Sequence, residues 1–222
     1  MLEVLKNLNW PLLTDALLSV IPALICITIH ELAHGYTAYR LGDDTAKQMG
    51  RLTLNPIKHI DFFGFLMMIV FKFGWANPVP VNPHNFKKPK RDMAITALAG
   101  PLSNILLAVF LLLLYGGLFP ILKNKAAGTV LEMIYITAYL SISLAAFNII
   151  PIPPLDGAKV LFSFVSDRTY FKLMRYERYG MIILIAVTAL NILPISAVTD
   201  FLFRKLFIVA EMVYHIVSKI VH

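Results

Sequence analysis

The stretch ALLSVIPALICITIHELAHG, residues 16–35, places two histidines and a glutamate at the end of a long apolar run. No charged residue occurs from Ala16 to Ile29, so this run has the composition of a membrane helix. Because a helix turns once every 3.6 residues, His30 and His34 project from one face, one turn apart. Two imidazoles at this spacing can bind one metal ion, with Glu31 beside them. The sequence therefore predicts a metal site inside a membrane-spanning helix.

The pattern His-Glu-x-x-His is typical of hydrolytic zinc sites, in which the glutamate acts as general base on the attacking water. In a soluble helix the same spacing can arise by coincidence. Inside hydrocarbon, coincidence would leave two imidazoles and a carboxylate without partners, which is energetically costly. Since ionisable groups within the membrane generally mark functional sites, we predict that Glu31 is catalytic and that His30 and His34 are metal ligands.

The composition indicates an integral membrane protein. Of the 222 residues, 58% are hydrophobic, and the mean hydropathy is +0.72, above the range of soluble domains. We predict an all-α polytopic membrane protein, a bundle of about four to six hydrophobic segments with a re-entrant or extended loop. Residues 1–222 are expected to form one domain, with a core of about 12–165 and C-terminal helices of about 179–221. The net charge of +7 suits basic cytoplasmic loops better than nucleic-acid binding.

The apolar segments differ in whether they reach the length of about 20 residues that a bilayer crossing needs. Three of them do, namely Leu12–Tyr39, Met93–Leu118 and Thr129–Ile150. Phe62–Trp75 is too short, so we expect it to be re-entrant or a tight hairpin. Near the C-terminus, Tyr179–Ile195 is a marginal span, and the charged Phe201–Val221 is either an interfacial helix or a poor span. We expect no cleavable signal peptide, because the first apolar run carries the metal motif.

The charges of the loops indicate an orientation, provided that Phe62–Trp75 returns to the side it came from. One side then has 13 lysines and arginines, in residues 40–60, 77–92 and 151–178. The other side has 3, in residues 1–10 and 119–128. The positive-inside rule places the first group in the cytoplasm, with the chain in the cell membrane. His30 lies about 15 Å along the helix from Arg40, so the active site is expected near mid-membrane, opening towards the cytoplasm.

The two histidines need a third partner, because catalytic zinc usually takes three protein ligands and keeps one position open. The other histidines lie in loops or in the tail. Asp156 is the best candidate among the acids, because it follows a spanning helix and Pro151–Pro154 let the chain turn back towards the bundle. The alternative is that Asp156 only caps a short helix, which we predict at Ala158–Val165.

Two amides near the ends of spanning helices are candidates for stabilising the oxyanion of a tetrahedral intermediate or for positioning the substrate. Asn104 belongs to the run Gly100-Pro101-Leu102-Ser103-Asn104, and Asn148 lies near the end of the next span. An interhelical hydrogen bond explains either amide equally well. We expect Gly100 and Pro101 to allow close packing against the metal helix.

The proline-rich segment, residues 77–83, reads Asn-Pro-Val-Pro-Val-Asn-Pro, and its three prolines favour an extended backbone. We predict that this segment, through Val79 and Val81, pairs with an unwound substrate as an added strand. The alternative is an ordinary interfacial loop.

Three motifs together resemble the site-2 protease family, the intramembrane zinc metalloproteases. They are His30–His34, Gly100–Asn104 and Asn148–Gly157, and their order and spacing agree with that family. Asn55-Pro56 and the residues around the proline-rich segment look like the compact prokaryotic branch, which has no PDZ or CBS domain. The combination is much more specific than His-Glu-x-x-His alone.

The resemblance implies hydrolysis of peptide bonds within or near the transmembrane helices of membrane-anchored proteins, in regulated intramembrane proteolysis. It implies that His30, His34 and Asp156 bind one Zn²⁺ per chain, and that Glu31 is catalytic. It also implies that Asn104 and Asn148 lie at the active site. The partners would be single-span membrane proteins and membrane lipid, and the oligomeric state is left open.

Two other functions are compatible with the same residues. A membrane metal-ion transporter or metal-handling protein would use the three ligands at mid-membrane but would not need Glu31 as a base. A non-catalytic membrane adaptor would have no need of all four groups, so their presence together argues against it.

Overall fold

The structure, a computed structural model, describes residues 10–64, 76–122, 125–175, 177–189 and 194–221. In these residues the chain is helical apart from turns and one isolated antiparallel bridge. The prediction of an all-α membrane protein is therefore confirmed. Two of the described helices are long and apolar enough to cross a membrane, Pro89–Leu118 and Ala127–Asn148.

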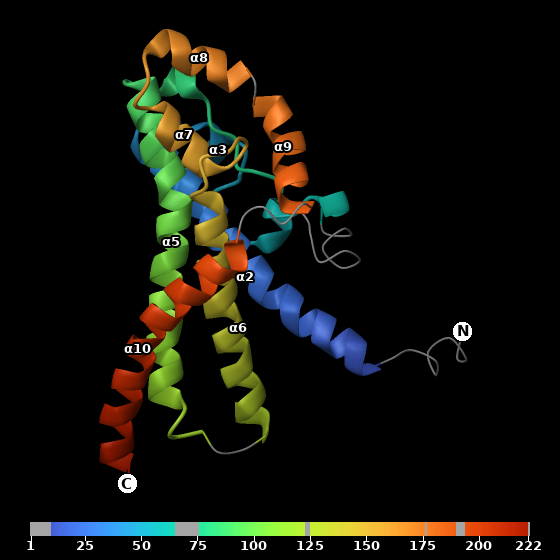
Figure 1. The fold of residues 1–222 in the computed structure, drawn as a ribbon, viewed down its shortest axis with the longest axis vertical. Helices are drawn as coiled ribbons and strands as arrows, with labels where there is room; N and C mark the ends of the chain where they lie inside the picture. The colour runs from blue at the N-terminus through green and yellow to red at the C-terminus, as the bar shows by residue number, and fades with distance from the viewer. Residues whose placement is uncertain (1–9, 65–75, 123–124, 176, 190–193, 222) are drawn as a thin grey trace, which may run out of the picture.

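Three long helices form the centre of the molecule (Figure 1). They are α2, Trp10–Arg40; α5, Pro89–Leu118; and α6, Lys125–Asn148. All three contact one another, and Pro22 is buried within α2 without ending it. The first turns of α2 diverge from the other two helices, whereas its second half, which carries the histidines, packs against them (Figure 1).

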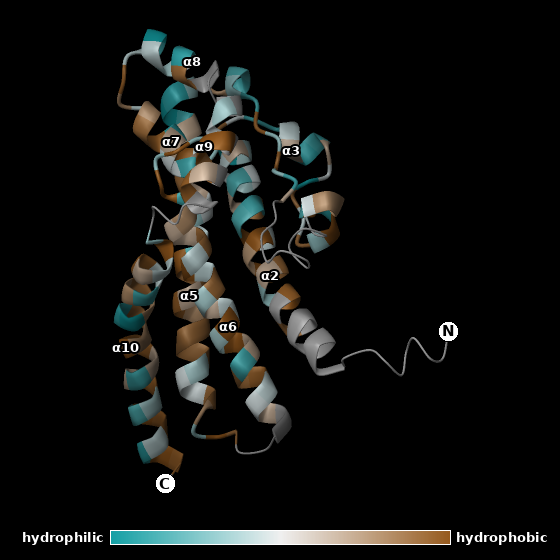
Figure 2. Cartoon of the chain, turned by 45° about the vertical axis from the view of Figure 1, so that its right-hand side comes forward, coloured by the Kyte–Doolittle hydropathy of each residue, from teal (hydrophilic) through white to brown (hydrophobic). Residues whose placement is uncertain are grey.

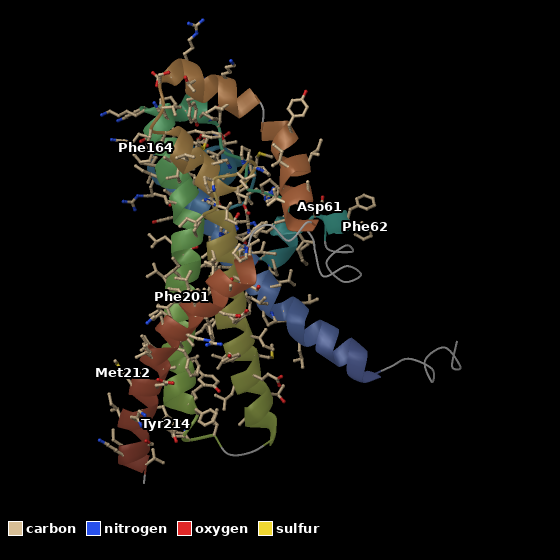
Figure 3. All side chains as sticks on the ribbon, viewed as in Figure 1. Asp61, Phe62, Phe164, Phe201, Met212 and Tyr214 are labelled. Carbon is tan, nitrogen blue, oxygen red and sulfur yellow. The ribbon has the colours of Figure 1, made fainter. Side chains whose placement is uncertain are left out.

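The last helix, α10 (Ile195–Val221), runs along the C-terminal half of α5 and also contacts α6 (Figure 1). Its core with these helices is apolar and consists of Ala108, Leu112, Ala138, Ile142, Phe203 and Ala210. The outer face of α10 carries exposed apolar residues such as Phe201 and Met212, as well as charged ones (Figures 2 and 3). This segment was expected as an interfacial helix or a poor span, and it forms a continuous helix packed on the bundle.

Short elements gather at the opposite end of the bundle, where α5 begins and α6 ends (Figure 1). They are α3, Thr45–Gln48; the 3₁₀ turns Pro56–His59 and Pro83–Asn85; α7, Asp156–Phe162; α8, Asp167–Arg175; and α9, Glu177–Ala189. The short helix expected at Ala158–Val165 is α7, which begins two residues earlier. The expected marginal span Tyr179–Ile195 is only partly described, and α9 has 13 residues, fewer than a bilayer crossing needs.

The predicted re-entrant segment Phe62–Trp75 lies mostly outside the described residues, which resume at Ala76. Its two flanks meet, since Ile60 and Ala76 form an antiparallel bridge and the Asn77 N–H donates to the His59 carbonyl oxygen at 2.9 Å. The chain therefore returns to the place from which it left, as a re-entrant segment requires.

Candidate metal centre

His30 and His34 project from the same face of α2, as their spacing predicts, and their rings meet edge to face with centroids 4.6 Å apart. Asp156, at the first turn of α7, lies opposite both rings. Its Oδ2 is 3.1 Å from His30 Nε2 and 3.1 Å from His34 Nε2. The three residues are at most 8% exposed, and their candidate ligand atoms all lie within 4.8 Å of one another.

These distances fit a shared metal ion. Two ligand atoms about 2.0–2.1 Å from a tetrahedral Zn²⁺ are separated by about 3.3 Å. The observed separations of 3.1 Å are close to this value, and two imidazoles with one carboxylate are a ligand set that zinc prefers. Among the described residues, this is the one group of three histidine, cysteine or acidic side chains with such geometry.

The loop before α7 brings Asp156 to the histidines from the end of α6. Leu155 is the residue that precedes the first turn, and no side chain caps the helix. The alternative in which Asp156 serves as the cap is therefore not what the structure shows. Gly157 is tightly constrained, because a Cβ there would overlap the carbonyl oxygen of Ile149 and lie 2.7 Å from that of Ile150.

Each candidate ligand has a partner behind it. The Nδ1–H of His34 donates to the carbonyl oxygen of Thr96 on α5 at 2.7 Å, which leaves Nε2 for the metal. Asn104, also on α5, has its amide 3.4 Å from Nδ1 of His30. The ammonium of Lys159 lies 3.8 Å from Oδ1 of Asp156, on the oxygen that does not face the histidines.

Gly100 allows α5 to approach the imidazoles. A Cβ at this position would lie 2.6 Å from Cε1 of His30 and closer still to the ring of His34, so the two buried rings would have to move. The close packing expected from Gly100 and Pro101 is therefore found, and its reason is the volume of the two rings.

A cavity of about 440 Å³ opens beside the ligands. Glu31 and Asn148 line it, as do Val79 and Val81 of the proline-rich segment. Asn104 is fully buried and is not among the lining residues, so of the two predicted amides only Asn148 faces this space. The Val79 N–H donates to Oε2 of Glu31 at 2.8 Å, which brings the proline-rich segment directly onto the predicted catalytic residue.

Several residues around the site were not predicted from the sequence. Thr96 acts through its backbone carbonyl, which no side-chain pattern reveals. Lys159 lies one turn after Asp156, a spacing that sequence reasoning could have used. His59 is buried, but its Nε2–H donates to the Thr53 carbonyl oxygen at 2.9 Å, away from the metal ligands. Cys26 is buried as well, with its thiol 3.4 Å from the Thr137 carbonyl oxygen.

Comparison with known proteins identifies the family of this chain. Residues 115–193 match the profile of Peptidase family M50, a range that contains Asn148 and Asp156. The chain is 43% identical over 171 residues to the putative zinc metalloprotease YwhC of Bacillus subtilis, covering 76% of this chain and 78% of YwhC. The chain belongs to peptidase family M50, the site-2 proteases.

Other members of the family extend the comparison. The putative zinc metalloprotease Rip2 of Mycolicibacterium smegmatis is 30% identical over 74% of this chain and 63% of its own length. The zinc metalloprotease RasP of Bacillus licheniformis is 30% identical over 70% of this chain and 33% of its own length. The chain thus spans less than two thirds of both proteins. No solved structure gives a significant match.

The predicted family and activity are therefore confirmed. The chain is an intramembrane zinc metalloprotease with Zn²⁺ as its cofactor, and it resides in a membrane. The names of the relatives give no support to the metal-transport alternative.

Proposed function

We propose that this site-2 protease cleaves membrane-anchored, single-span proteins within or next to their transmembrane segments, at zinc held by His30, His34 and Asp156. One observation carries the proposal. Two imidazole nitrogens of α2 and a carboxylate oxygen from more than a hundred positions further along the chain converge beside a cavity that Glu31 lines. The two described helices that are long and apolar enough to cross a membrane, α5 and α6, both contact α2, so a substrate reaching this point would also lie in the membrane.

Glu31 is placed to handle the protons of hydrolysis. Its Oε2 is held by the Val79 N–H, and no described group donates to Oε1. This second oxygen is therefore available to take a proton from the attacking water and to pass it to the leaving amine. Zinc, when bound, supplies a Lewis acid that acidifies the water and polarises the scissile carbonyl.

Asn104 supports the ligand geometry in this proposal rather than the oxyanion. Its Oδ1 is buried without a partner, whereas its Nδ2 is the atom 3.4 Å from Nδ1 of His30. Rotating the amide by half a turn exchanges the two atoms without moving the side chain. Oδ1 then accepts the Nδ1–H of His30 and leaves Nε2 for zinc, which mirrors the Thr96 carbonyl behind His34.

Asn148 is the better oxyanion donor of the two amides. Its side chain lines the cavity at the last residue of α6. One N–H of its amide group donates to the Leu144 carbonyl oxygen at 3.0 Å. A primary amide has a second N–H, which is free to stabilise a developing oxyanion.

The proline-rich segment supplies the surface on which the substrate extends. Within the described residues, the backbone N–H of Val81 and the carbonyl oxygens of Val79 and Val81 have no hydrogen-bond partner. These are the groups that an added strand needs, and a helix must unwind before its peptide bonds can use them. Pairing here would bring the substrate backbone past Glu31.

The orientation follows from where the basic elements lie. α3, α8 and the start of α5 gather at the end of the bundle nearest the site, together with the loops that carry most lysines and arginines (Figure 1). We place this end in the cytoplasm, with the chain as a multi-pass protein of the cell membrane and the cavity opening to the cytoplasmic side.

The test uses the wild type and Glu31→Gln, purified without chelators and reconstituted in vesicles with a panel of single-span substrates. We expect one zinc per chain in both proteins and a loss of hydrolysis of about 10²- to 10⁴-fold in the variant, the usual contribution of a general base. Cleavage by Glu31→Gln at the wild-type rate, or a wild-type protein without zinc, would contradict the proposal.

A further inference from the structure

The proline-rich segment does not rest on Glu31 by itself. Pro78, Pro80 and Pro83 have no N–H, so the segment cannot complete a hydrogen-bonded ladder of its own. It nevertheless packs tightly on α2: a Cβ added at Gly35 would lie 2.9 Å from Cγ1 of Val79. Other groups must therefore fix the position of the segment.

Two charged side chains, one acting at each end of the segment, supply these contacts. At the first end, Nη2 of Arg51 donates to the carbonyl oxygens of Asn77 at 2.7 Å and Pro78 at 3.3 Å. At the second end, Oδ2 of Asp43 accepts the backbone N–H of Asn82 at 2.7 Å, and its Oδ1 accepts the amide of Asn85 at 2.7 Å. The bond from Val79 to Glu31 lies between these two points.

Both charged residues are buried, and neither pairs with an opposite charge among the described residues. Asp43 is 0% exposed and Arg51 is 9% exposed. Burial alone would raise the pKa of Asp43, but hydrogen bonds from Thr45, Asn82 and Asn85 outweigh it and hold the pKa below its usual range. The charge of Asp43 is thus maintained, and it is directed at backbone and amide groups rather than at a cation.

Asp43 and Arg51, which act as clamps on the segment, are also tied to α2, the helix that carries Glu31. Asp43 is tied to it directly and Arg51 through α3. The Asp43 N–H donates to the carbonyl oxygen of Ala38, in the last turns of α2, at 2.9 Å. The Arg51 N–H donates to the carbonyl oxygen of Ala46, in the short helix α3, at 2.8 Å. The segment that contacts the Glu31 carboxylate is therefore positioned from α2, directly through Asp43 and by way of α3 through Arg51.

We propose that Arg51 and Asp43 are positioning residues that hold the proline-rich segment so that the Val79 amide fixes the orientation of the Glu31 carboxylate. The inference rests on the proposed role of Glu31 as general base. Because the same segment offers the free backbone groups of Val79 and Val81, the clamps also align the substrate strand with that base.

The test compares Arg51→Gln and Asp43→Asn with two neighbouring controls, Arg40→Gln and Asp44→Asn. Arg40 and Asp44 are exposed. Within the described residues, their side chains hydrogen-bond with Tyr36 and Gln48, respectively, and not with the proline-rich segment. Hydrogen exchange is measured on peptides covering residues 76–86, together with zinc content and steady-state kinetics on a cleaved single-span substrate. Exchange and zinc content need no substrate, so they remain informative even if no substrate is cleaved.

For the two clamp variants we expect exchange at Val79 and Asn82 to be about 10-fold faster, because local opening becomes easier. Zinc content should stay at one per chain, while kcat falls about 10- to 100-fold through misplacement of the base. A purely structural role would instead lower zinc content and accelerate exchange in α5 and α6 as well. The controls should match the wild type in all three measurements.

A milder variant decides the matter if either clamp variant does not fold. Asn85→Ala, at an exposed residue, removes one bond to Asp43 together with the weaker contacts of the Asn85 amide with Thr45 at 3.2 Å and Asn82 at 3.5 Å, and it leaves both charges in place. We expect a smaller change in the same direction, about 2- to 3-fold in exchange at Asn82. Unchanged exchange at Val79 and Asn82 in the zinc-loaded variants, or unchanged kcat with faster exchange, would overturn the proposal. Failure of the wild type to cleave any substrate would instead count against the proposed function.

Discussion

Gly100 and Gly116 lie on the same helix, α5, and both are contact points at which a Cβ would overlap a neighbour, yet they serve different purposes. Gly100 makes room for the two imidazole rings of the metal site. Gly116 makes room for the backbone of α10 at Ala210, in the apolar half of the bundle. The half of α5 around Gly100 therefore serves the metal site, and we call it the chemical half. The half around Gly116 serves helix packing, and we call it the packing half.

The two halves should respond differently to substitution. Around Gly100 the contacts are directional, from ring nitrogens to a carbonyl, an amide and a carboxylate, so each partner has few replacements. Around Gly116 the close neighbour is the backbone of Ala210, and the surrounding core consists of apolar side chains whose packing depends on volume rather than on direction. Zinc affinity and helix packing can therefore be measured as separate properties.

The largest effect is expected from Asp156→Ala, which removes a ligand from the chemical half. We expect zinc affinity to fall by about 10³-fold or more, because two imidazoles alone make a weak site. Metal content per chain after dialysis against a weak chelator gives the measurement. Asp167→Ala is the matched control, since Asp167 is an exposed acid on α8 whose side chain pairs, within the described residues, with Lys90 and not with the histidines. Equal zinc retention in the two variants would refute the ligand assignment.

The next largest effect is expected from Gly100→Ala, which tests whether the metal site depends on the close approach of α5 to the imidazole rings. The added methyl group pushes on both rings, so we expect zinc affinity to fall by about 100-fold while the protein remains folded. Chelator competition measures the affinity, and circular dichroism monitors the helices. If zinc affinity is unchanged, the rings do not depend on this close approach.

Asn104→Leu should have a smaller effect of about 10-fold on zinc affinity, within the usual range for a partner behind a ligand. Leucine has the same branched shape, although it is larger, and it cannot accept the N–H of His30. Asn104→Asp restores an acceptor and should recover part of the affinity. If neither substitution changes zinc binding in a chelator competition, Asn104 belongs to the packing half despite its position.

The smallest effect on the metal is expected from Gly116→Ala, the counterpart of Gly100→Ala. Here the methyl group meets the backbone of Ala210, and we expect the free energy of unfolding to drop by about 1–3 kcal/mol with zinc affinity unchanged. Denaturation in a mixed detergent, followed by circular dichroism, measures the first quantity. A parallel loss of zinc would show that the two halves are coupled.

Sequence reasoning went furthest where the chemistry is periodic. The spacing of His30 and His34 dictated a shared face on any helix, and their place in an apolar run implied function, because such groups are costly in lipid. The lengths of α5 and α6 followed from hydropathy in the same way. The return of the chain at Asp156 could be predicted from Pro151–Pro154, because prolines exclude a continuing helix.

What the sequence did not show is chemistry carried by the backbone or by distant loops. The carbonyl of Thr96 looks like any other peptide group. The bonds of Arg51 and Asp43 to the proline-rich segment join residues 26 and 39 positions apart, and no periodicity links them. For α10, the charged residues left open whether the expected helix lies in the interface or spans poorly, and its packing on α5 involves the small residues Gly116 and Ala210.

The separation of the metal ligands along the chain has a consequence for biosynthesis. His34 and Asp156 are 122 residues apart, so a nascent chain exposes the histidines long before the aspartate emerges from the ribosome. The complete ligand set exists only after α5 and α6 have been inserted and α7 has followed them. With the proposed ligand set, zinc-dependent hydrolysis requires a chain that has been synthesised beyond Asp156, and we expect a truncated translation product that lacks Asp156 to be inactive towards neighbouring membrane proteins.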